Sequence, residues 1–183
     1  RGGDLKEGDD KRKTVVRAIR LNKRLDDILK ADAKKKGISV GSLFSSILTK
    51  YSEWDRFVES FGYITLNSLT LRHFLETSDE ETLQRIAREI GSKVVKDNLR
   101  FFLKRIDMDS YLAWVERFYR YSRTAEAEIE RKGDLTTIII RHEFGDKWSR
   151  FQATIISEAM KAIFNMVPEI ETSDSTIAVS FRQ

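Results

Sequence analysis

The sequence of 183 residues contains no cysteine. Disulfides, thiolate zinc sites and cysteine nucleophiles are therefore excluded. A chain without disulfides fits a reducing compartment, so we expect a cytoplasmic protein. No apolar run approaches the roughly 20 residues that span a bilayer, and no signal peptide is visible. We therefore expect no membrane partner.

Histidine is almost as scarce, with His73 and His142 the two examples. A lone histidine beside a strand end, as in residues 141–145, is more often a structural or surface group than a metal ligand. No phosphate loop of the Walker type, nucleophile elbow or zinc protease pattern occurs. The paired acids of residues 79–81 lie at an expected helix start, where the helix dipole accounts for them. We predict no enzyme activity, no metal and no cofactor.

Positive charge is modest overall but unevenly distributed. The chain has 33 basic and 29 acidic residues, a formal net charge of +4. Residues 1–61 hold 15 basic and 10 acidic residues, whereas residues 62–183 hold 18 and 19. Residues 11–36 alone hold 11 basic and 3 acidic residues. This asymmetry predicts a surface that meets a polyanion, although a solvated helix face would show the same pattern.

Residues 13–54 have the pattern of one short basic strand, a helix, a glycine turn and a second helix. The strand, Thr14–Leu21, is rich in β-branched residues and has no partner within its own segment. Unpaired strand groups are costly. A second copy of the chain would complete a two-stranded antiparallel ribbon, and a basic ribbon fits the major groove of DNA.

The alternation of the strand assigns its side chains to two faces. Ile19 and Leu21 share a face that we expect to pack on the helices. The other face, which we expect to point outward, carries Val16, Ala18 and Arg20.

Helix signals follow the strand directly. Asn22 is a good N-cap for a helix from Lys23, Gly37 suits the position just after its end, and Ser39 caps the next helix. The second helix has a wide apolar stripe from Leu43 to Trp54, which needs more partner surface than one short helix supplies. An intertwined homodimer would supply that surface.

The segment GISVGSLFSSILTKY at 37–51, after a basic strand that ends in Arg-Leu-Asn, resembles the ribbon-helix-helix family of DNA-binding proteins. This family includes the Arc and methionine repressors. The resemblance covers residues 13–54, within an expected DNA-binding domain of residues 13–61. It implies a homodimer that binds double-stranded DNA and regulates transcription, as a repressor does. It leaves open whether dimers pair further into a tetramer.

The resemblance implies roles for particular residues. Val16, Ala18 and Arg20 would face base edges, and the start of the second helix, Ser39, Val40 and Gly41, would clamp a phosphate. Only Arg20 can make the bidentate contact to guanine, since Val16 and Ala18 can at most touch a thymine methyl. Non-specific, chromatin-like DNA binding is therefore an open alternative.

Further basic residues complete the expected DNA-binding set. Residues 1–12 are predicted to be a disordered polar and basic arm. Lys11, Arg12 and Lys13 would contact phosphates from this end of the chain. The alternation of side chains along the strand points Arg17 towards the helices. It could still contact a phosphate if it lies at the end of the ribbon, or if the strand register differs by one residue. Lys23 is the last member of the set.

Residues 62–183 are predicted to form an α+β domain. We expect helices that start at Asn67 or Ser68, in residues 77–80, and at Asp109 or Ser110, and a long helix over 144–166 stopped by Pro168. The expected strands are 63–66, 124–131, 135–142 and 176–181, with a hairpin turn at 132–134. This order resembles a ferredoxin-like βαββαβ plan, an α/β sandwich with an enlarged helical crossover.

Domains of that general plan follow ribbon-helix-helix segments in the nickel-responsive repressors. The C-terminal domain is accordingly expected to serve oligomerisation or the sensing of an unknown small-molecule ligand. The metal part of the analogy fits badly, because this chain has two histidines and no cysteine. Its many aromatic residues would form a core or line an apolar pocket. A third alternative is an antitoxin-like protein-interaction module that uses the ribbon only to dimerise.

Overall fold

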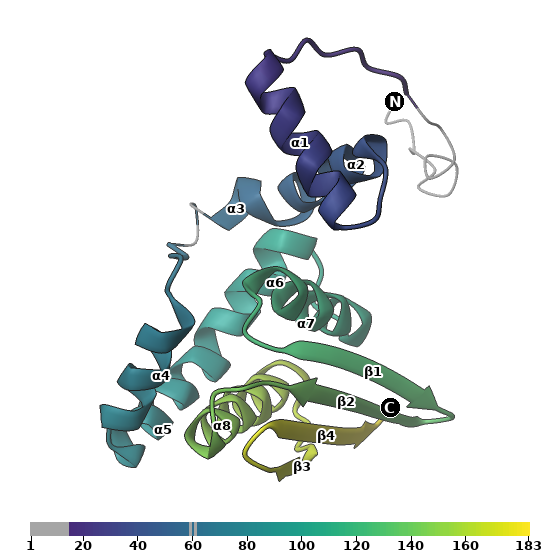
Figure 1. Ribbon diagram of the computed structural model, residues 1–183. Helices are drawn as coiled ribbons and strands as arrows, with labels where there is room; N and C mark the ends of the chain where they lie inside the picture. Colours follow the sequence, from purple (N-terminus) through teal and green to yellow (C-terminus); the bar gives the residue numbers. More distant parts are fainter. Residues whose placement is uncertain (1–14, 59, 61) are drawn as a thin grey trace, which may run out of the picture. The chain divides into compact units, whose positions relative to one another are not determined.

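Figure 1 shows a computed structural model of the chain, which describes residues 15–58, 60 and 62–183. The expected arm of residues 1–12, with Lys11, Arg12 and also Lys13, lies outside the described residues. Two compact units divide the chain, the first ending at Leu48 and the second spanning Thr49–Gln183.

The first unit is built on α1 (Lys23–Lys35) and α2 (Val40–Lys50). The expected cap of α1 is confirmed, because the Asn22 side-chain oxygen accepts a hydrogen bond of 2.9 Å from the Leu25 amide. Gly37 has a φ of +66°, the left-handed conformation that glycine adopts at low cost after a helix. A small core of Leu29, Ala33 and Leu43 holds the two helices together.

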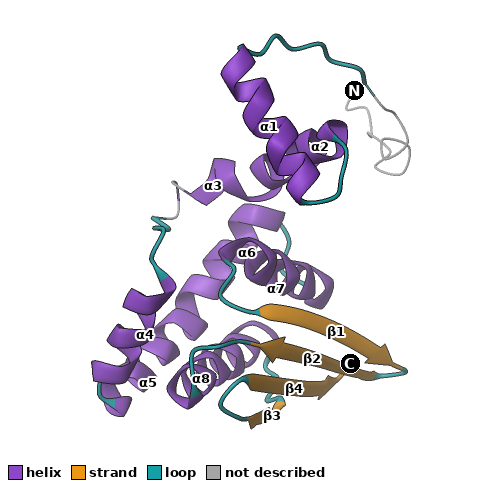
Figure 2. Cartoon of the chain, viewed as in Figure 1, coloured by secondary structure: helices purple, strands orange, loops and turns teal. Residues whose placement is uncertain are grey.

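Residues 15–22 precede α1 and form no strand within the single chain, as the loop colouring in Figure 2 shows. The prediction of a strand is therefore not met in one copy, because a strand needs a paired neighbour and the described residues supply none. Leu21 packs partly against the small core, as expected. Ile19, expected on the same packed face, is instead exposed.

The end of the second helix belongs to the second unit. After α2 the helix widens into a π turn, Tyr51–Asp55, and closes with α3 (Arg56–Val58). Trp54 is buried, with its ring centroid 5.5 Å from that of Tyr63 and 5.7 Å from that of Phe102. These contacts account for a division at residues 48 and 49, earlier than the expected 61 and 62.

Five further helices follow in the second unit. They are α4 (Ser68–Thr77), α5 (Glu80–Glu89), α6 (Val95–Leu103), α7 (Met108–Ser122) and α8 (Asp146–Phe164). A π turn at Ile90–Val94 joins α5 to α6 without a break. The expected start of α7 is wrong by two or three residues, because Asp107 is the N-cap and accepts a hydrogen bond of 2.8 Å from the Ser110 amide.

One antiparallel sheet of four strands completes the second unit (Figure 1). Its strands are β1 (Glu126–Lys132), β2 (Leu135–Arg141), β3 (Glu169–Thr172) and β4 (Thr176–Arg182), in the order β1-β2-β4-β3. In the register, Ile138 faces Ile129 on one side and Val179 on the other. The α+β class predicted from the sequence agrees with this mixture of helices and sheet.

The expected βαββαβ order is corrected to ββαββ. Residues 63–66 form no strand: Ile64 is 82% exposed, and the Tyr63 amide donates to the Val58 carbonyl at 3.2 Å instead of to a neighbouring strand. The fourth strand is instead β3, which forms a hairpin with β4 after the chain has reversed beyond Pro168. The predicted strands over 124–131, 135–142 and 176–181 differ from β1, β2 and β4 by one or two residues at their ends.

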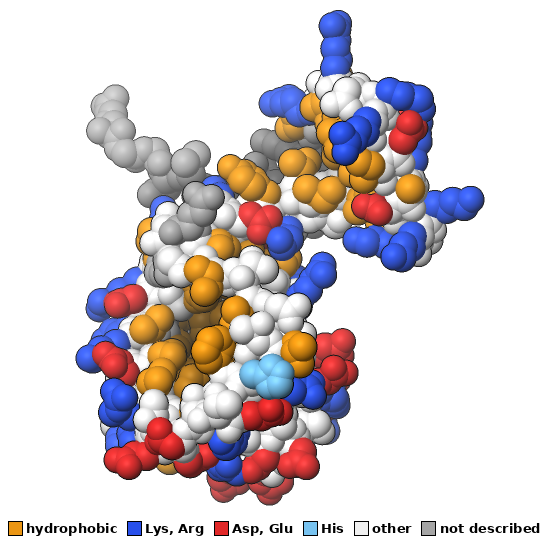
Figure 3. Space-filling view, turned by 60° about the vertical axis from the view of Figure 1, so that its left-hand side comes forward, with side chains coloured by type: hydrophobic (Ala, Val, Ile, Leu, Met, Phe, Trp, Pro, Cys, Tyr) orange, Lys and Arg blue, Asp and Glu red, His pale blue; other side chains and the backbone are white. Residues whose placement is uncertain are grey.

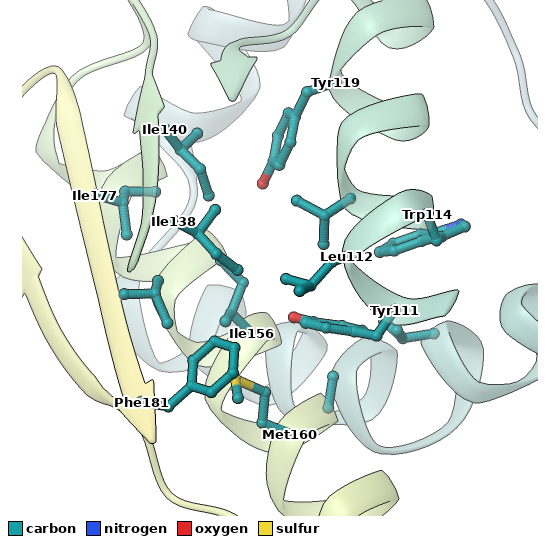
Figure 4. Packing of buried hydrophobic residues seen from close by; sticks show 14 of the residues in the cluster. Tyr111, Leu112, Trp114, Tyr119, Ile138, Ile140, Ile156, Met160, Ile177 and Phe181 are labelled. Atoms are coloured by element: carbon teal, nitrogen blue, oxygen red, sulfur yellow. The ribbon is translucent and has the colours of Figure 1, made fainter. Parts of the chain in front are cut away.

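The main core lies between the sheet and the helices. Ile138, Ile140, Ile177 and Val179 are fully buried on one sheet face, as strand alternation predicts. Figure 4 shows these sheet isoleucines facing Tyr119 and Leu112 of α7. Helix α8 packs against the π turn at Ile90–Val94 and against the β3–β4 hairpin.

Candidate nucleic-acid interface

The expected base-reading residues lie on an exposed segment of the first unit. Val16, Ala18 and Arg20 all expose their side chains, and Val16 does so to 92%. Their expected outward orientation is compatible with this exposure. However, Val15, Arg17 and Ile19 are exposed as well, so a single copy does not distinguish the two faces of the segment.

Basic side chains of the first unit differ in whether they form ion pairs within the chain. Among the described residues, Arg17, Arg20 and Arg24 form no ion pair. Arg24, on α1, is an exposed cation that sequence reasoning left out of the expected set. Lys23 is within 2.5 Å of Asp27, and this exposed pair would have to open for Lys23 to reach a phosphate. The three arginines are therefore the more available cations.

The expected phosphate clamp lies at the start of α2. The Ser39 hydroxyl oxygen accepts a hydrogen bond of 3.0 Å from the Ser42 amide, so Ser39 is the helix cap. The amides of Val40 and Gly41 belong to the first turn, which has no intrahelical acceptor for them. Ser39 and Gly41 are exposed. A helix start with accessible amides suits a phosphate oxygen, but capping alone also explains Ser39.

Apolar side chains are unusually exposed on this small unit. Figure 3 shows hydrophobic side chains among the Lys and Arg side chains of the α1–α2 unit. The exposed set comprises Val15, Val16, Ile19, Leu25, Ile28, Ile38, Ile47 and Leu48. Exposed apolar surface of this extent, on a unit with a core cluster of three buried residues, is typical of a surface that a partner covers.

His142, the histidine at the end of β2, has a structural environment. Its Nδ1 accepts a hydrogen bond of 3.2 Å from the Phe144 amide, so Nε2 carries the proton and donates it to the Ser149 hydroxyl at 2.8 Å. Ser149 in turn donates to the Ser173 carbonyl. Burial lowers the pKa of His142. Ser149 is fully buried, which is a poor position for a nucleophile.

A broad polar hollow of about 890 Å³ opens beside His142, at the start of β1 and the end of β2. Arg72, Arg120, Arg123 and Arg141 contribute positive charge to its wall. Arg141 is paired with Glu128 at 3.1 Å, and Arg72 donates to the Glu143 carbonyl at 2.8 Å. Two of the four arginines are thus already engaged in holding the sheet end and α4.

The described residues contain no group of three or more histidine or carboxylate side chains that could hold a metal ion. Within the same residues, no helix combines the length and the apolar character needed to cross a membrane. Comparison of the chain with models of protein families, with curated proteins and with solved structures gave no match in any of the three.

Proposed function

We propose that the chain is a homodimeric DNA-binding regulator of transcription. In this proposal residues 15–21 of two copies pair as an antiparallel ribbon that enters the major groove. The second unit serves oligomerisation or ligand sensing. The observation that carries the proposal is the exposed, unpaired segment before α1, next to two helices whose apolar side chains remain uncovered in one copy.

Pairing of two copies would provide for both the unpaired backbone and the uncovered apolar side chains. A two-stranded ribbon would give the backbone groups of residues 15–21 hydrogen-bond partners. The same association would cover exposed side chains of α1 and α2 such as Ile28 and Ile47, and burial of apolar surface is the main favourable term in association. A second copy is the simplest partner, because it carries the same segment.

The charge of the first unit supports DNA as the ligand of the dimer. Residues 15–36 hold eight basic and three acidic residues, and the dimer would present this set twice. Release of counterions from DNA phosphates would then drive binding. Arg20 is the residue suited to a base edge, and Arg17, Lys23 and the start of α2 are suited to phosphates.

Fluorescence anisotropy with labelled random duplex DNA tests the proposal across a salt series. We expect affinity for the full chain to fall steeply with salt, and Arg20→Ala to weaken binding at low salt by at least about tenfold. The matched control is Arg88→Ala, which removes the same charge from the exposed face of α5 and should change affinity less than about twofold. Equal losses in both variants, or no binding by a folded dimer, would contradict the ribbon as the DNA contact.

Non-specific binding is the second candidate, favoured by the apolar nature of Val16 and Ala18. These side chains offer no hydrogen bond to a base edge. Competition between random DNA and sequences selected from a random pool separates the two candidates. Selectivity below about tenfold would favour a chromatin-like protein, since specific regulators usually exceed it by far.

A further inference from the structure

A partly open cavity of about 360 Å³ lies within the second unit, lined by the π turn at Ile90–Val94 and by α6, α7 and α8. Figure 3 shows a hollow edged by hydrophobic side chains on one face of this unit. Protein interiors are close-packed, and voids much larger than a water molecule are few. An apolar cavity of roughly 150 Å³ already binds benzene, so this one, at more than twice that volume, has room for a molecule of about two to three aromatic rings.

The wall of the cavity carries no charged side chain. Tyr111 and Tyr119 contribute to it, and burial raises the pKa of each tyrosine far above its ordinary value. Burial likewise raises the pKa of Tyr63. All three phenols therefore stay neutral, and the remaining wall is mostly aliphatic and aromatic. An ion would lose its hydration here without gaining a counter-charge, so the wall selects an uncharged ligand.

Two buried polar groups in this wall lack partners. The Asn98 side chain is 2% exposed and donates a hydrogen bond of 2.9 Å from Nδ2 to the Tyr63 hydroxyl. Its Oδ1 has no hydrogen-bond partner among the described residues, and neither has Nε1 of Trp114, which is 8% exposed. Buried polar atoms are nearly always paired, so each calls for a partner that the described residues do not supply.

A third polar group is already held in place. The Gln152 side-chain oxygen accepts a hydrogen bond of 2.9 Å from the Tyr119 hydroxyl. This bond fixes one polar pair on the wall by contacts within the protein. The unmet acceptor of Asn98 and the unmet donor of Trp114 are thus the groups that a ligand would satisfy. An apolar pocket with a few polar groups of this kind is the usual form of a small-molecule site.

We propose that this cavity is a binding site for a neutral small molecule of about two to three rings. The molecule carries a hydrogen-bond donor for Oδ1 of Asn98 and an acceptor for Nε1 of Trp114. The site does not depend on the DNA-binding proposal, because all of its residues lie within the second unit. A chain that does not bind DNA could still bind the small molecule, and a chain without this site could still bind DNA through the ribbon.

Two related dyes, added to the full chain, test whether the cavity prefers an uncharged ligand. N-phenyl-naphthylamine is neutral and has one N–H donor, whereas anilinonaphthalene sulfonate adds a sulfonate to the same scaffold. We expect the neutral dye to bind with one molecule per chain and the sulfonate at least about tenfold more weakly, because the wall offers no counter-charge. No binding of the neutral dye, or equal affinities, would overturn the proposal.

Two tryptophan substitutions locate the dye. Val94 contributes to the wall and is 42% exposed, so Val94→Trp fills the cavity from its rim without crowding the deep core. We expect this variant to bind the neutral dye at least about tenfold more weakly. Val167→Trp places the same ring on an exposed residue outside the wall and should bind like the unmodified chain. Equal binding by both variants, with unchanged circular dichroism, would place the dye elsewhere and overturn the assignment.

Asn98→Leu tests the polar contact. The unmodified chain should prefer N-phenyl-naphthylamine over phenylnaphthalene, which has the same rings and no N–H group. The variant should lose most of this preference, because leucine has no acceptor for the N–H. An unchanged preference in the variant would show that Asn98 does not accept a hydrogen bond from the ligand.

Discussion

Gly91 lies where the backbone of the π turn meets helix α8. A Cβ atom at this position would come within 2.5 Å of the Ile155 carbonyl oxygen and 2.8 Å of the Glu158 Cβ. Both atoms belong to or adjoin the α8 backbone and cannot swing away. Gly91→Ala should therefore push the helices apart and lower the free energy of unfolding by about 1–3 kcal/mol. Urea unfolding followed by tryptophan fluorescence measures the change.

The neighbouring Ser92 supplies the control for Gly91. Its hydroxyl donates to the Arg88 carbonyl at 2.7 Å and lies 3.3 Å from the Glu89 carbonyl, both in the helical segment just before it. Ser92→Ala should stay within about 0.5 kcal/mol of the unmodified chain. An unchanged midpoint for Gly91→Ala would show that the contact with α8 is looser than the distances indicate.

His142 makes the stability of the second unit depend on pH. Burial lowers its pKa in the folded chain, so as the pH falls the unfolded chain takes up the proton first. Its contribution is complete above the ordinary histidine pKa of about 6.5 and is lost as the pH falls towards the lower, folded value. We expect the free energy of unfolding to fall between about pH 7 and about pH 5.

A glutamine at position 142 does not titrate and can still donate to Ser149. His142→Gln should therefore lose less stability over the same pH interval than the unmodified chain, as measured by urea unfolding at each pH. His73→Gln, on an exposed histidine of α4, is the control for the loss of any imidazole. Parallel pH profiles for the unmodified chain and His142→Gln would contradict the assignment of this dependence to His142.

At the scale of elements, local signals predicted some features and tertiary pairing decided the others. Strand alternation correctly placed Ile177, Val179 and Phe181 inward, because all three are buried. The strand β3 escaped prediction, since Glu169–Thr172 is short and mostly polar and is a strand only through its pairing with β4. Residues 63–66 had the composition of a strand but pair with no strand in the described part of the chain.

The distinction between local signals and tertiary contacts also applies to the DNA-binding segment and to the cavity. Exposure of Val16, Ala18 and Arg20 and the capping role of Ser39 could be predicted from residue order, whereas the exposure of Ile19 could not. The cavity could not, because Asn98 and Trp114 lie on different helices and meet only in the folded unit. Aromatic content alone does not distinguish a filled core from a lined pocket.

The segment before α1 gives a prediction that depends on pairing. Adjacent residues of a ribbon alternate in the direction of their N–H groups, so one of Arg17 and Ala18 must donate to the partner strand. At least one of Arg17→Pro and Ala18→Pro should therefore weaken the dimer, because proline removes the donor. Sedimentation equilibrium at micromolar concentration measures the effect. Two fully dimeric variants would exclude the ribbon as the interface.

At the scale of the whole molecule, the two units differ in charge. The excess of positive charge belongs to residues 1–61, whereas residues 62–183 are nearly neutral. In the proposed division of roles, the first unit meets the DNA polyanion and the second encloses a neutral ligand. Salt should accordingly weaken DNA binding while leaving affinity for the neutral dye unchanged.

Dimerisation of the whole chain follows from the apolar surface of the first unit. Leu48 is 63% exposed in one copy, so Leu48→Glu would have little effect on a monomer, whereas at a dimer interface it would bury a charge without a partner. We expect the variant to dissociate at least about tenfold more readily in sedimentation equilibrium. Val167→Glu, at a 75% exposed site of the second unit, should remain dimeric. A full chain that sediments as a monomer would remove the partner strand on which the ribbon depends, and DNA binding by paired strands would have to be abandoned.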